Sequence, residues 1–134
     1  MRKKRRFHPG ALLFLSGIFL VIFAAGASAR GASHARGASA SAGLALVKGR
    51  GCLLCHTTNG KPLVGPSWKG IYGTKVTVMV NSRPEVKTVD EKYLRFMITN
   101  PNVWVVKGYK PIMTVTPLAP EQVDDIIAYI KTLK

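Results

Sequence analysis

Both cysteines of this 134-residue chain lie in one pentapeptide, Cys52-Leu53-Leu54-Cys55-His56. The C-x-x-C-H pattern is typical of covalent haem attachment, in which each thiol adds to one vinyl group of the porphyrin and the adjacent histidine reaches the iron. No thiol then remains for a disulfide. The motif therefore predicts a fold built around one haem that is bound through Cys52 and Cys55, with His56 on the iron.

Two other chemistries use closely spaced cysteines. A closed structural zinc site needs four ligands, and adjacent Cys55 and His56 cannot both point at one tetrahedral ion without strain. A dithiol oxidoreductase places its C-x-x-C motif near alternating strands and helices, which do not follow His56 in this sequence. A C-x-x-C thiol oxidoreductase nevertheless stays as an alternative function, which a purified protein without haem would favour.

The N-terminus has the three parts of an export signal. Residues 2–6 are all basic, residues 11–25 are almost entirely apolar, and Ala27-Ser28-Ala29 fits a cleavage site. Residues 1–29 are therefore predicted to be an export signal, which places the mature protein in the periplasm. The alternative is an uncleaved anchor, because residues 10–29 come close to the roughly 20 residues that a spanning helix needs.

The next segment, residues 30–41, is rich in Gly, Ala and Ser and repeats the tetrapeptide RGAS. It has no apolar periodicity, so it is predicted to be a flexible linker between the signal and a folded domain at residues 42–134. With an uncleaved anchor, this linker would tether the domain to the cytoplasmic membrane, facing the periplasm.

The chain is strongly basic. Residues 30–134 hold 15 Lys and Arg against six acids, a formal net charge of +9. An exported protein seldom meets nucleic acid, and the sequence holds no nucleic-acid-binding motif, so no nucleic-acid partner is expected. An acidic protein surface is the better candidate, because complementary charge accelerates encounter.

The folded part reads as mainly α. Helices are predicted at residues 42–51, at residues 91–99 with Asp90 as N-cap, and from Pro120 to the C-terminus. Residues 75–89 alternate with a period of two around an Asn81-Ser82-Arg83-Pro84 turn, which predicts a small β-hairpin inserted among the helices.

Together these segments resemble the class I (mono-haem) cytochrome c family over residues 42–134. They are most similar to its bacterial single-domain branch, which includes the cytochrome c domain of haem-copper oxidase subunit II. Besides the pentapeptide, the resemblance rests on Gly43…Leu46-Val47…Gly51, on Gly65-Pro66…Gly70-Ile71-Tyr72-Gly73, on Asp90 to Leu94, on Asn100-Pro101-Asn102, on Lys107-Gly108-Tyr109…Met113, and on Ile126 to Lys131. It implies a cytochrome c fold, with the N- and C-terminal helices packed around one covalently bound haem.

The resemblance also implies individual roles. Met113 is expected to be the second axial iron ligand, although Met79 and Met97 compete for it and Thr114 stands where the family usually has proline. The Pro66 carbonyl is expected to receive the ring N–H of His56. The remaining implied contacts are Tyr72 and Trp104 with the haem edge or propionates, and Gly43 and Val47 with Tyr129 between the terminal helices.

The implied function is that of a one-electron carrier in a respiratory or other periplasmic chain, and not of an enzyme. A second alternative is a gas sensor or peroxidase-like protein, which would need a labile Met113. The expected partner is an acidic oxidase or reductase that docks on a lysine-rich haem edge, and the protein is expected to be a monomer. The lysines expected at that edge are Lys61, Lys69, Lys107 and Lys110.

Overall fold

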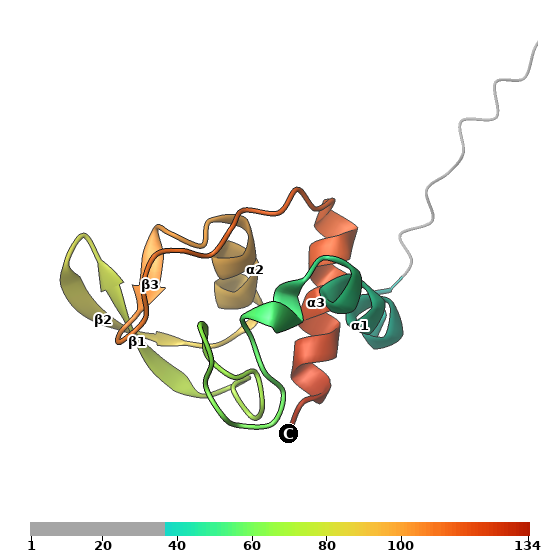
Figure 1. The fold of residues 1–134 in the computed structure, drawn as a ribbon, viewed down its shortest axis with the longest axis horizontal. Coiled ribbons are helices and arrows are strands. Elements are labelled where there is room, and N and C mark those ends of the chain that lie inside the picture. Colours follow the sequence, from blue (N-terminus) through green and yellow to red (C-terminus); the bar gives the residue numbers. More distant parts are fainter. Residues whose placement is uncertain (1–36) are drawn as a thin grey trace, which may run out of the picture. The chain divides into compact units, whose positions relative to one another are not determined.

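The computed structural model describes residues 37–134. The predicted export signal or anchor, and the linker up to residue 36, lie outside the described residues. Within residues 37–134, three α-helices, one short 3₁₀ helix and three strands follow one another, and Figure 1 shows their arrangement. In chain order these elements are α1 (Ala40–Gly49), η1 (Cys52–Leu54), β1 (Lys75–Val80), β2 (Arg83–Thr88), α2 (Glu91–Thr99), β3 (Trp104–Val106) and α3 (Pro120–Thr132).

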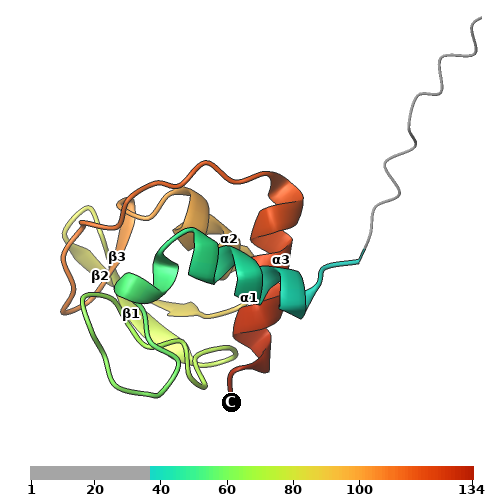
Figure 2. The same ribbon diagram turned by 45° about the vertical axis from the view of Figure 1, so that its right-hand side comes forward.

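The first and last helices pack against each other, and α1 crosses α3 in both views of the ribbon (Figures 1 and 2). The crossing is close because Gly43 of α1 has no side chain: a Cβ there would lie 2.0 Å from the carbonyl oxygen of Asp125 and 2.8 Å from Cβ of Tyr129. Val47 is fully buried one turn further along α1. The predicted contact of Gly43 with Tyr129 is thus present in the structure.

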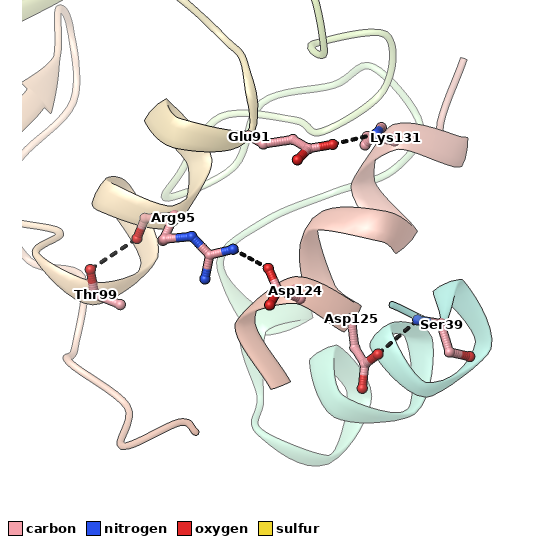
Figure 3. Close-up of polar contacts among 7 residues, drawn as sticks. All are labelled: Ser39, Glu91, Arg95, Thr99, Asp124, Asp125 and Lys131. Carbon is pink, nitrogen blue, oxygen red and sulfur yellow. Dashed lines mark hydrogen bonds and ion pairs between the residues drawn. The ribbon is translucent and has the colours of Figure 1, made fainter. Parts of the chain in front are cut away.

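A polar contact closes the same crossing at the start of α1. The carboxylate of Asp125, only 1% exposed, accepts a hydrogen bond from the backbone N–H of Ser39 at 2.7 Å (Figure 3). The side chain of Ser39 caps α1 by accepting from the N–H of Ala42. Because of this cap, α1 begins at Ala40, two residues before the predicted start of the helix.

Helix α2 has its predicted bounds, and Asp90 caps it by accepting a hydrogen bond from the N–H of Tyr93 at 2.7 Å. Two ion pairs join α2 to α3, Arg95 with Asp124 and Glu91 with Lys131 (Figure 3). The C-terminal helix begins at Pro120, as predicted.

The hairpin is present, but it belongs to a three-stranded antiparallel sheet in the order β2-β1-β3. The predicted four-residue turn was wrong. Only Asn81 and Ser82 form it, both with positive φ, as two-residue hairpin turns require. Pro84 lies within β2 opposite Met79, which is possible because an edge strand can lack one N–H donor.

The core gathers side chains from both terminal helices, from α2 and from β1. Its most buried members are Val47, Val78, Val89, Val123 and Ile130. Among residues 37–134, no helix is long and apolar enough to cross a membrane. The domain thus has the predicted helices around one core, with a small sheet on its flank.

Candidate haem site

A largely apolar cavity of about 470 Å³ opens between η1, α2, α3 and the loops before and after β3. This volume is typical of a ligand or cofactor pocket. Apolar side chains make up most of its wall, with Leu94 and Met97 from α2 and Ile126 and Ile130 from α3. The ion pairs of Arg95 with Asp124 and of Glu91 with Lys131 also join the two helices that carry these side chains.

The C-x-x-C-H motif forms one side of this cavity. Cys52, Cys55 and His56 all line it, and both cysteines are free thiols. The short η1 helix places them, since the N–H groups of Cys55 and His56 both donate to the carbonyl of Cys52. Gly51 precedes the helix with φ at +72°, a conformation that favours glycine. Two thiols and an imidazole therefore face one apolar space, which is the donor set that covalent haem attachment needs.

The ring of His56 is oriented by the loop that follows it. Its Nδ1 lies 2.9 Å from the carbonyl oxygen of Pro66, as the family resemblance implied. A carbonyl can only accept, so Nδ1 carries the proton in this bond and Nε2 keeps its lone pair. A bond of this type fixes both the tautomer and the ring direction of a metal-ligating histidine.

Gly65 and Trp68 enclose the same imidazole. A Cβ on Gly65 would lie 2.6 Å from Cε1 of His56, so only glycine lets the loop pass so near. The ring of Trp68, 8% exposed, stacks on the imidazole with the centroids 4.8 Å apart. The loop is tied back to the motif by two backbone bonds, from Gly65 N–H to the Cys55 carbonyl and from Trp68 N–H to the Thr57 carbonyl.

These surroundings keep His56 neutral. Burial lowers the pKa of His56 below its usual value, and the hydrogen bond to Pro66 only partly offsets this effect. Neutral imidazole is the form that binds a metal. Burial also raises the pKa of the Cys52 thiol, whereas reactive thiols of dithiol oxidoreductases have a lowered pKa. The environment of the motif therefore favours metal ligation over thiol exchange.

Two methionines line the cavity, and a third does not. Met113 lies in the loop between β3 and α3 and is 37% exposed, and Met97 projects from α2. Met79 lies in β1 and is absent from the lining. The carbonyl of Met113 accepts a hydrogen bond from Nδ2 of Asn102 at 3.2 Å.

The two aromatic residues expected at the haem edge differ in position. Trp104 lines the cavity and packs on Phe96, with the ring centroids 4.0 Å apart. Tyr72 is not among the lining residues; its ring lies 5.2 Å from the ammonium group of Lys131. The structure thus brings Trp104, but not Tyr72, to the wall that the two thiols and His56 share.

The charged residues of the cavity wall are basic. Arg50 and Lys110 line it, and no Asp or Glu does. The other three lysines expected at this edge, which are Lys61, Lys69 and Lys107, are exposed but outside the lining. Around the opening, Leu54, Val64 and Ile112 expose apolar side chains.

Sequence reasoning missed Trp68, Arg50 and Asn102 as parts of the site. Arg50 comes shortly before Cys52, and Trp68 comes shortly after Pro66. This proximity in sequence could have suggested a role for both residues. Asn102 lies 11 residues before Met113, on the other side of β3, and no pattern in the sequence indicates that the two residues meet.

Comparison with known proteins agrees with this geometry. The profile of the cytochrome c family matches residues 40–134. Cytochrome c2 iso-2 of Magnetospirillum molischianum is 36% identical over 104 residues, which cover 72% of this chain and all of that protein. Cytochrome c2 iso-1 of Magnetospirillum fulvum is 35% identical over 91 residues, covering 62% of this chain and 91% of that protein.

Among solved structures, cytochrome cH from Methylobacterium extorquens superposes with a TM-score of 0.52 at 28% identity, covering 70% of this chain and 98% of that one. The described residues share its general fold, which in this chain consists of three α-helices and a small antiparallel sheet. The chain belongs to the cytochrome c family, whose members carry one covalently attached c-type haem and transfer single electrons.

Proposed function

We propose that Cys52 and Cys55 hold the haem through thioether bonds and that His56 and Met113 are its two axial ligands. The observation that carries the role of His56 and the two cysteines is the bond from Nδ1 of His56 to the Pro66 carbonyl, which leaves Nε2 free beside two free thiols in one apolar cavity. Met113 is proposed as the other ligand because it lines the same cavity from a loop, whereas Met97 projects from a helix. When bound, the haem supplies a centre that gains and loses one electron. His/Met ligation raises its reduction potential.

Other residues of the chain would orient the His56 ring and exclude solvent from the haem. Gly65, Pro66 and Trp68 hold the His56 ring in one orientation and keep it from water. The apolar walls of α2 and α3 exclude solvent from the group, which is one of the means by which a protein sets a reduction potential. If His56 and Met113 both held the iron, no position would stay open for a substrate, which would favour an electron carrier over an enzyme or a gas sensor.

The assignment can be tested with the protein expressed in a host that attaches c-type haem. The intact mass should exceed the polypeptide mass by one haem, and Cys52→Ser together with Cys55→Ser should abolish the increase. The ferric protein should show the weak sulfur-to-iron absorption band at the red edge of its spectrum. A haem-free product from such a host would contradict the assignment and favour the thiol oxidoreductase, and rapid carbon monoxide binding by the reduced protein would favour the sensor.

We further propose that the basic opening of the cavity docks an acidic redox protein. Arg50 and Lys110 lie at the wall, and exposed Leu54 and Ile112 supply apolar contact area between the charges. Such a surface steers an anionic partner and is screened by salt, since the Debye length is about 10 Å at 0.1 M. The partner would be an oxidase or reductase of a periplasmic chain.

Hexacyanoferrate(II), a small anionic reductant, can replace the unknown partner in a first test. Its rate of reduction of the ferric protein should fall steeply with added salt, and Lys110→Glu should lower the rate at low salt. Lys92→Glu makes the same charge change on α2 at a residue outside the cavity wall and should have a smaller effect. Equal effects of the two reversals would mean that net charge alone, not this surface, guides the anion.

A further inference from the structure

The segment that carries Met113, residues 113–118, makes few hydrogen bonds. In the part of the chain that the structure describes, residues 113–118 take part in a single hydrogen bond, from Nδ2 of Asn102 to the carbonyl of Met113. Met113 and Val115 are exposed, at 37% and 57%. Thr114 follows Met113, so the φ restriction of a proline is also missing. The position of Met113 along this segment therefore depends on few contacts.

Asn102, in contrast, lies between two regular elements. It follows Pro101, which is buried and lines the cavity, and it lies two residues before the β3 strand. The turn that contains it is closed by a hydrogen bond from the N–H of Val103 to the carbonyl of Asn100 at 3.2 Å. Asn102 is itself exposed, but the end of α2 and the start of β3 hold its turn on both sides, so its amide group is a donor with regular structure before and after it.

We infer that Asn102 is a positioning residue for the methionine ligand: its side-chain amide holds the Met113 backbone at the cavity and lowers the fraction of molecules in which the methionine is detached. This inference rests on the proposed role of Met113 as an axial ligand. The bond acts on the backbone beside the ligand's own Cα, so it restrains Met113 without touching the sulfur.

The size of the effect follows from the bond that is lost. A hydrogen bond of this kind contributes enough to shift a local equilibrium about two- to tenfold. Removing it should raise the detached fraction by that factor. A small ligand that takes the position of Met113 binds only the detached form, so its apparent affinity should rise by the same factor.

The experiment uses the haem-loaded protein with imidazole as the competing ligand. Asn102→Asp keeps the size of the side chain but replaces the donor by an acceptor, which cannot bond to a carbonyl, and Asn102→Leu removes both. Asn100→Asp is the matched control: this asparagine is exposed in the same turn, and its amide donates only to the hydroxyl of Thr99. Imidazole affinity is measured by titrating away the sulfur-to-iron band.

We expect both Asn102 variants to bind imidazole about two- to tenfold more tightly, and the Asn100 variant to match the wild type. Unchanged affinity in both variants, with the band present in all proteins, would overturn the inference and leave the proposed ligand set intact. If imidazole affinity rose as much in Asn100→Asp as in Asn102→Asp, the inference would also be overturned, because a general loosening of the turn would then explain the effect. A wild-type protein without the band would refute Met113 as ligand, and the inference with it.

Discussion

The crossing of α1 and α3 at Gly43 gives the sharpest prediction. Gly43 is buried where α1 crosses α3, and a methyl group there would lie 2.0 Å from the carbonyl oxygen and 2.6 Å from the carbonyl carbon of Asp125. Carbon atoms in contact are normally about 3.5 to 4.0 Å apart. The obstacle is the backbone of a helix, which cannot rotate away as a side chain can. Gly43→Ala must therefore push the two helices apart by about 1 Å or more.

The cost can be estimated from what the separation disturbs. Overpacking a core typically destabilises a protein by about 1 to 3 kcal/mol. Because backbone is the obstacle, the upper end applies. The shift also strains the hydrogen bond from Ser39 to buried Asp125, worth about 1 kcal/mol, while the alanine gains roughly as much in helix propensity. These two small contributions cancel, which leaves about 3 kcal/mol of lost stability, or about 12 to 24 °C in melting temperature for a domain of this size.

Gly49→Ala is the control, because it makes the same change in the same helix. Nothing lies within 4 Å of a Cβ at Gly49, and its φ is not positive, so this variant should gain up to about 1 kcal/mol from helix propensity. Urea unfolding of both haem-loaded variants, followed by far-ultraviolet circular dichroism, measures the two midpoints. If the Gly43 variant unfolds at the wild-type midpoint, the helices do not cross at that residue. A loss of similar size in both variants would contradict the steric argument.

Three further predictions concern the site. Gly65→Ala should displace the His56 ring from its partner carbonyl, costing about 1 kcal/mol in stability and changing the reduction potential measured by voltammetry; an unaltered potential would contradict the tight fit. Met113→Ala should abolish the sulfur-to-iron band and Met97→Leu should retain it, and the reverse result would make Met97 the ligand. Burial raises the pKa of Tyr93 from 10.0 to about 12, so the folded form holds the tyrosine proton more tightly than the unfolded one. The resulting stability, about 2 to 3 kcal/mol, is complete below pH 10 and lost as the pH rises through 12. Tyr93→Phe should not lose this stability, which can be measured in denaturation curves recorded from pH 10 to about pH 12.

The parts of the fold that the sequence predicted well are those with local causes. The bounds of α2 agreed with the prediction because Asp90 bonds to a backbone N–H three residues away and Asn100-Pro101 ends the helix. The start of α3 agreed because Pro120 suits a first helical position. The bond from His56 to Pro66 joins residues 10 apart in the chain, and the family resemblance, not a local pattern, implied it.

The parts that the sequence did not reveal depend on contacts between distant segments. Strand β3 has only three residues, too few for a recognisable period, and exists because Val105 and its neighbours pair with β1. The register of Pro84 within β2 was hidden for a similar reason, since only the sheet order shows that β2 is an edge strand. Tyr72 was placed by resemblance, and its actual neighbour, Lys131, comes from the far end of the chain.

The two expected iron ligands differ in how many contacts hold them. Pro66, Gly65 and Trp68 enclose the ring of His56, and two backbone hydrogen bonds tie their loop to the motif. Met113 lies in a segment without regular structure, and among the described residues 113–118 take part in a single hydrogen bond, from Asn102. Local opening begins where few contacts hold the chain. Loss of structure at this site should therefore begin on the Met113 side, while the half formed by His56 and the two cysteines stays folded.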